Sequence, residues 1–164
     1  VTSTCRPLRR AHIAISKCVS SGVKMTQIEP GATCPLTMTY AAAPALRAFA
    51  PTPLQDAWLP GLTRRAYDGA ARPFYEKQAL TLGMAMTEKQ GGSDVRTNST
   101  RAAPAGSQTG RDAAYLLSGH KFFCSAPMSD AFLTLAYTDV GLSCFLVPRW
   151  TPDGARNNLA AAER

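Results

Sequence analysis

The sequence predicts an α+β fold, in which a short helical lead-in is followed by an antiparallel β-barrel-like domain. Three observations support this prediction. Residues 37–49 are rich in alanine and carry their large apolar side chains at helical spacing. From residue 79 onward, short apolar or alternating runs replace that pattern. Turn residues separate these runs, as is typical of barrels and sandwiches.

The helical part contains two segments. Residues 37–49 predict a helix that ends before Pro51 and is kinked or split at Pro44, because proline removes a backbone donor. Residues 53–69 predict a shorter helical piece, broken by Pro60 and Gly61. The polar residues 68–76 are a plausible boundary between two architectures.

The strands are expected in the second half. Residues 79–87 indicate a buried strand, although so short an apolar run does not distinguish strand from helix by period alone. The Thr-rich run 95–103 alternates as a half-exposed strand would, and residues 104–112 have the composition of a turn. Two short strands are expected around Ser118-Gly119, and two more in residues 130–138 and 141–149.

Composition places the chain among globular proteins. Its 164 residues are 45% hydrophobic and 18% charged, which is unlike a disordered chain. No uninterrupted apolar run approaches the length of about 18 residues that a membrane-spanning helix needs, so we expect no membrane partner.

The net charge of +7 is concentrated at one end. Residues 1–25 carry five basic side chains and no acid, which leaves 13 basic and 11 acidic side chains for the rest. A nearly neutral body argues against nucleic-acid binding by this chain, since phosphate neutralisation needs a basic surface. The leading segment has the composition of an organellar transit peptide, but the preferred explanation is a poorly ordered end or sequence that does not belong to the domain.

Cysteine and histidine residues show no metal-binding spacing. The five cysteines are far apart, without a C-x-x-C pair, and the two histidines do not share a helical face. An odd number of widely spaced cysteines fits reduced thiols, so a cytoplasmic location is expected rather than an organellar matrix.

The stretch MTEKQGGSDVR, residues 86–96, is a candidate ligand-facing loop. Gly91 and Gly92 would let backbone N–H groups approach a ligand closely, and Thr87 and Ser93 add hydroxyl groups. Neither a Walker motif nor a G-x-G-x-x-G motif is present. A glycine turn on the surface needs no ligand, and both explanations stay open on the residues alone.

A second candidate is GHKFFCSAP, residues 119–127. In a strand, Phe122 and Phe123 would point to opposite faces, so that one fills the core and the other faces a ligand. Two ordinary strand aromatics are the more common arrangement. His120 could act as a base, but a surface histidine is more common and no partner can be assigned to it.

Four stretches together carry a resemblance to a known family. These are LTMTYAAAPALR, GMAMTEKQGGSDVR, SGHKFFCSAPMSDAFLTLAY and GLSCFLVPRWTPDGARN. The last three resemble the middle β domain of the acyl-CoA dehydrogenase family, in its AidB-like branch (adaptive response to alkylation). The first resembles the end of that branch's N-terminal helical domain. The resemblance covers about residues 25–157 and implies a fragment without the family's C-terminal helical bundle.

This resemblance implies a division of the chain. Residues 1–24 would be a basic, poorly ordered segment unlike the family. Residues 25–76 would end the N-terminal helical domain, 77–157 would form most of the flavin-facing middle domain, and 158–164 would be a tail.

The resemblance also implies FAD as cofactor. The family's loop against FAD matches the 86–93 stretch, and its Trp-Ile-Thr strand matches residues 123–125, which read Phe-Cys-Ser here. The residues carried over as cofactor-binding are Met86, Thr87, Gly92, Ser93, Phe123 and Ser125. Phe123 would keep an aromatic face and Ser125 a hydroxyl. The departure from Trp-Ile-Thr puts chain-type acyl-CoA substrates in doubt.

The implied reaction is α,β-dehydrogenation of an acyl thioester. The family's base is a carboxylate of the C-terminal domain, so no catalytic residue is assigned here, and Glu88 is not given that role. The chain alone is expected to be inactive. The full-length protein is expected to be a homo-oligomer, with nucleic-acid contact possible only there. The alternatives are a flavin-containing, DNA-associated protective protein and a folded remnant without ligand.

Overall fold

The structure is a computed structural model that describes residues 20–157. Within the described residues, 20–37 belong to one compact unit and 38–157 to another. Most of the expected basic segment 1–24 and the expected tail 158–164 lie outside the described residues. Residues 20–28 are helical and exposed. The later elements are α2 (Pro30–Phe49), α3 (Thr52–Leu62), η1 (Phe74–Glu76), β1 (Leu82–Ala85), η2 (Val95–Thr97), β2 (Arg101–Pro104), β3 (Tyr115–Ser118), β4 (Ala131–Thr138) and β5 (Gly141–Pro148).

The two helices continue through their prolines, contrary to the sequence expectation. α2 begins seven residues earlier than expected, at Pro30, and runs unbroken past Pro44 to Phe49. Pro44 is exposed, while Ala43 and Leu46 beside it are buried, so packing outweighs the lost hydrogen bond. α3 includes Pro60 and Gly61 and ends at Leu62.

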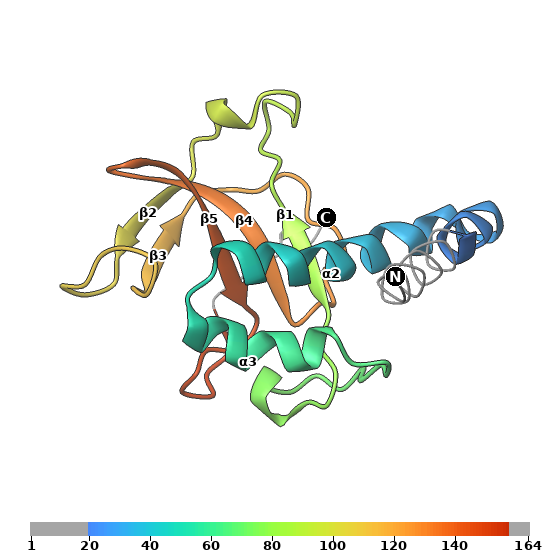
Figure 1. The fold of residues 1–164 in the computed structure, drawn as a ribbon. Helices are drawn as coiled ribbons and strands as arrows, with labels where there is room; N and C mark the ends of the chain where they lie inside the picture. Colours follow the sequence, from blue (N-terminus) through green and yellow to red (C-terminus); the bar gives the residue numbers. More distant parts are fainter. Residues whose placement is uncertain (1–19, 158–164) are drawn as a thin grey trace, which may run out of the picture. The chain divides into compact units, whose positions relative to one another are not determined.

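The core of the second unit lies between the helices α2 and α3 and the strands β1 and β4 (Figure 1). Its buried members come from α2, α3, β1, β4 and the turn before β1: Ala42, Leu46, Trp58, Leu62, Leu80, Leu82, Ala131 and Leu133. The Trp58 ring stacks on Phe74 with centroids 4.5 Å apart. The Thr39 hydroxyl lies 3.0 Å from the Leu82 amide nitrogen, which fixes α2 to the start of β1.

The five strands form one mixed sheet, not the antiparallel barrel that was expected. β4 is its centre: it pairs antiparallel with β5 along its length and parallel with β1. β2 meets β4 in parallel at a single register pair and runs antiparallel to β3. More than 40 residues connect β1 to β4, which is enough for the chain to return and run in the same direction. The first four residues of β4 are all buried, as expected of a central strand.

Two expected strands are absent or shortened. Residues 95–97 form a 3-10 turn because the Asp94 side chain accepts a hydrogen bond from the Arg96 amide, so β2 begins only at Arg101. Within residues 119–125 there is no strand, only an isolated bridge between Ser125 and Met84. The loop between β2 and β3 is present as expected. The boundary proposed near residue 76 between two family domains stays a prediction.

Among the described residues, no helix has both the length and the apolar character needed to cross a membrane.

Candidate cofactor site

The structure brings together the two sequence stretches that were singled out. We call residues 86–93 the Gly-Gly loop and residues 122–125 the Phe-Phe segment. The Ser125 amide donates to the Met84 carbonyl at 3.0 Å, and the Phe122 amide donates to the Thr87 carbonyl at 2.9 Å. The two stretches therefore run antiparallel, and this register places Phe123 beside Met86.

The Gly-Gly loop is shaped by a tight turn. The Gly91 amide donates to the Glu88 carbonyl at 3.0 Å, and Gly91 has a φ of 104°, which favours glycine. A Cβ on Gly92 would lie 3.0 Å from the Thr87 hydroxyl oxygen. Glycine at this position therefore lets the backbone pass close to that hydroxyl. Ser93 follows and is exposed.

Three hydroxyl groups at these stretches are free to bind a ligand. Within residues 20–157, the side chains of Thr87, Ser93 and Ser125 have no hydrogen-bond partner. The Phe123 side chain is 60% exposed, although it is a large apolar group. The two stretches thus present hydroxyls without partners, a glycine without a side chain and an exposed aromatic group, all of which are available to a ligand.

Met86 has a different environment from the other five predicted residues. Its side chain is partly buried and packs against the core cluster. Its carbonyl accepts a hydrogen bond of 2.9 Å from the Asn98 side chain. The structure therefore gives the Met86 side chain a packing role.

Glu88 is buried beneath the loop, with 2% of its surface exposed. One carboxylate oxygen accepts from the Ser99 amide at 2.6 Å and from the Ser99 hydroxyl at 2.8 Å. The other accepts from the Thr100 amide at 3.0 Å, from the Thr100 hydroxyl and from the Lys121 ammonium at 2.8 Å. Burial raises the pKa of Glu88, but these donors outweigh it and hold the pKa well below its usual range. Such a carboxylate stays ionised and is not a general base.

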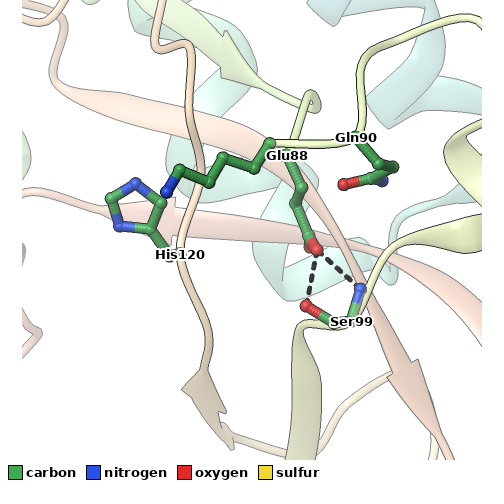
Figure 2. A pocket seen from close by; sticks show the side chains of 5 residues that line it. Glu88, Gln90, Ser99 and His120 are labelled. Atoms are coloured by element: carbon green, nitrogen blue, oxygen red, sulfur yellow. Dashed lines mark hydrogen bonds between the residues drawn. The ribbon is translucent and has the colours of Figure 1, made fainter.

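A shallow pocket of about 430 Å³ lies next to this carboxylate. Its lining residues are Glu88, Lys89, Gln90, Ser99 and His120. In Figure 2 the Glu88 carboxylate points toward Ser99, and His120 lies on the other side. None of the six predicted cofactor residues lines this pocket. His120, which sequence reasoning considered as a base, is exposed here.

The Cys124 thiol lies between Phe123 and Ser125. Desolvation raises its pKa, and the nearby Arg149 guanidinium only partly offsets this effect. The thiol is therefore protonated at neutral pH and is a poor nucleophile.

Two buried ion pairs, each formed by a lysine, were not recognised in the sequence. Lys121 was given no role from the sequence, yet its side chain is only 14% exposed and pairs with Glu88. Lys77 and Asp130 form a second buried pair at 2.6 Å that was not foreseen. No local sequence pattern identifies either pair, because the partner carboxylates lie 33 and 53 positions away along the chain.

Two sequence families match the chain. "Acyl-CoA dehydrogenase, middle domain" matches residues 83–160, and "Adaptive response protein AidB N-terminal domain" matches residues 7–69. The second match includes most of residues 1–24, a segment that had been expected not to resemble the family.

Individual relatives agree with these matches. The AidB protein of Escherichia coli (strain K12) is 52% identical over 133 residues, which are 81% of this chain and 24% of that protein. The structure of Caenorhabditis elegans ACDH-11 in complex with C11-CoA is similar with a TM-score of 0.55 and 31% identity, over 76% of this chain and 21% of that one. The FAD complex of PigA is similar with a TM-score of 0.53 and 26% identity, over 74% of this chain and 28% of that one.

The chain thus spans about a quarter of the length of the relatives it matches. The two family matches follow one another along the sequence, and together they include both stretches of the candidate site. On this evidence the chain belongs to the acyl-CoA dehydrogenase family, in its AidB-like branch.

Proposed function

We propose that this chain supplies the flavin-facing surface of an FAD-dependent oxidoreductase that acts on the CH–CH group of an acyl thioester. The observation that carries the proposal is the set of hydroxyls on Thr87, Ser93 and Ser125, which have no partner within residues 20–157. They belong to two stretches joined by backbone hydrogen bonds, one of which also carries the exposed Phe123 side chain. When bound, FAD would accept a hydride from the substrate.

The chain's own residues have binding and orienting roles in this proposal. Thr87 and Ser93 donate hydrogen bonds from the Gly-Gly loop, and Gly92 allows close approach of the backbone. Ser125 donates from the opposite stretch. Phe123 provides an apolar face for a flat ring and excludes water from it.

The substrate class is proposed from the relatives. One similar structure holds C11-CoA and another holds FAD, and each statement concerns that protein. An acyl thioester and FAD are therefore the first ligands to test with this chain and with any longer form of it.

Removal of the substrate proton needs a base that these two stretches do not supply. Glu88 is the only carboxylate within residues 84–93 and 122–125. It is buried, its oxygens are occupied by donors and its pKa is lowered. We therefore propose that this chain binds flavin but does not by itself turn over a thioester substrate.

The test is an FAD titration followed by flavin absorbance and fluorescence. Saturable uptake is expected, with affinity reduced about tenfold by Ser93→Ala, the loss of one hydrogen bond of about 1.4 kcal/mol. Phe123→Ala is expected to weaken binding by at least as much. Ser107→Ala, in the exposed loop between β2 and β3, is the matched control and should leave affinity unchanged. Absence of uptake by a folded chain would refute flavin binding by this chain.

A further inference from the structure

We infer that the buried Glu88–Lys121 pair is a positioning device that fixes the Gly-Gly loop against the Phe-Phe segment and so sets the geometry of the flavin-facing surface. The inference rests on the proposed function, because it gives a role to residues behind the proposed site. Neither residue is placed in contact with the cofactor.

The ion pair links Glu88 of the Gly-Gly loop to Lys121, the residue directly before the Phe-Phe segment. Glu88 follows Thr87 in the Gly-Gly loop, and Lys121 precedes Phe122 in the other stretch. Their side chains meet at 2.8 Å, with 3% of the Glu88 and 14% of the Lys121 side chain exposed. A backbone hydrogen bond from the Phe122 amide to the Thr87 carbonyl joins the same two stretches at the neighbouring residues. The two stretches are thus tied at the residues next to the candidate site.

Each member of the pair is also fixed to the sheet. The Glu88 carboxylate accepts from backbone and side-chain groups of Ser99 and Thr100, immediately before β2. The Lys121 ammonium donates to the Leu135 carbonyl of β4 at 2.7 Å. Both ends of the pair therefore have a fixed position, and neither stretch can shift without breaking buried charge-assisted hydrogen bonds.

Close packing behind the pair restricts it further. A Cβ on Gly119 would lie 2.7 Å from the Thr100 Cα, so the backbone that leads to Lys121 runs directly against the start of β2. The second buried pair, Lys77–Asp130, contacts Thr81 instead and holds the start of β1 to the start of β4.

These two pairs provide a matched comparison. Lys121→Met and Lys77→Met each remove one cation from a buried pair, but only the first lies behind the candidate site. Amide hydrogen exchange, measured by NMR on the chain without added ligand, is the first readout. Lys121→Met should speed exchange at the Phe122 and Gly91 amides at least tenfold beyond any global change, and Lys77→Met should not.

FAD affinity of the folded fraction is the second readout. Lys121→Met is expected to weaken it at least tenfold, Lys121→Arg should recover much of the loss, and Lys77→Met should leave it unchanged. Glu88→Gln keeps the shape of the side chain and serves if Lys121→Met does not fold. It should show the same pattern with smaller amplitude.

The outcomes separate the two claims. If the unaltered chain takes up no FAD, the proposed function fails, and the exchange data alone decide whether the pair fixes the two stretches. If the chain binds FAD but Lys121→Met and Lys77→Met behave alike in both readouts, the pair is an ordinary stabilising contact and the inference is overturned.

Discussion

Glu88 is the residue whose environment differs most from what its surroundings in the sequence indicate. It stands in a polar loop among Thr87, Lys89 and Gln90, where an exposed carboxylate would be ordinary. The structure instead buries it and gives it five donors from Ser99, Thr100 and Lys121. The family resemblance implied that Glu88 is not the base, but the donors come from residues 11 to 33 positions away, which no local pattern reveals.

The lowered pKa of Glu88 predicts a pH dependence of stability. The folded-state pKa lies below the unfolded value of 4.5, so the stabilisation is fully present above that value and is lost as pH falls toward the folded pKa. The free energy of unfolding should therefore decrease below pH 4.5. Urea unfolding at a series of pH values measures this. Glu88→Gln should flatten the acid limb, and an equally steep limb in this variant would assign the effect to other carboxylates.

Gly83 is expected to tolerate no side chain. A Cβ there would lie 2.6 Å from the Ser125 carbonyl and 2.9 Å from the Phe132 ring. Gly83→Ala should therefore lower the free energy of unfolding by about 1–3 kcal/mol and disturb the bridge between Met84 and Ser125. Gly106→Ala, with nothing within 4 Å of the added atom, is the control. Equal stability of the two variants in urea unfolding would show that the close contact at Gly83 is absent.

At the scale of elements, runs of one residue class predicted the structure better than single turn residues did. β4 and β5 lie within 130–138 and 141–149 as expected, because a continuous apolar run marks a central strand and its neighbour. The run 95–103 failed as a strand because one side chain, Asp94, caps a 3-10 turn at its start. Pro44 failed to break α2 because buried neighbours stabilise the helix on both sides. Both predictions were wrong because contacts with other residues, which the intrinsic propensity of a residue for helix or strand does not include, decide the local structure there.

Packing of α3 against the core depends mainly on Trp58. Its side chain is 2% exposed and stacks on Phe74. Trp58→Ala should lower the free energy of unfolding by about 3–5 kcal/mol, because it leaves a large cavity. Tyr40→Ala, at a residue of α2 that is 70% exposed, should change it by less than about 0.5 kcal/mol. Thermal or urea unfolding distinguishes them, and a small effect at Trp58 would contradict this packing.

At the scale of the whole molecule, the mixed sheet explains how two distant stretches form one surface. β1 leads into the Gly-Gly loop, and the chain returns past Phe122–Ser125 before entering β4 beside β1. The four stretches that resemble the family identified both parts of the candidate site and the family, since each of them is local in sequence. The parallel pairing of β1 with β4 was missed, because register between strands more than 40 residues apart is set by packing and not by pattern.

The Gly-Gly loop and the Phe-Phe segment are proposed to form one flavin-facing surface. The most direct test is NMR mapping of backbone amides during addition of FAD to the chain. Shifts should be concentrated at residues 86–93 and 122–126, with little change at the loop between β2 and β3. Shifts confined to residues elsewhere, or none at saturating FAD, would contradict this proposal.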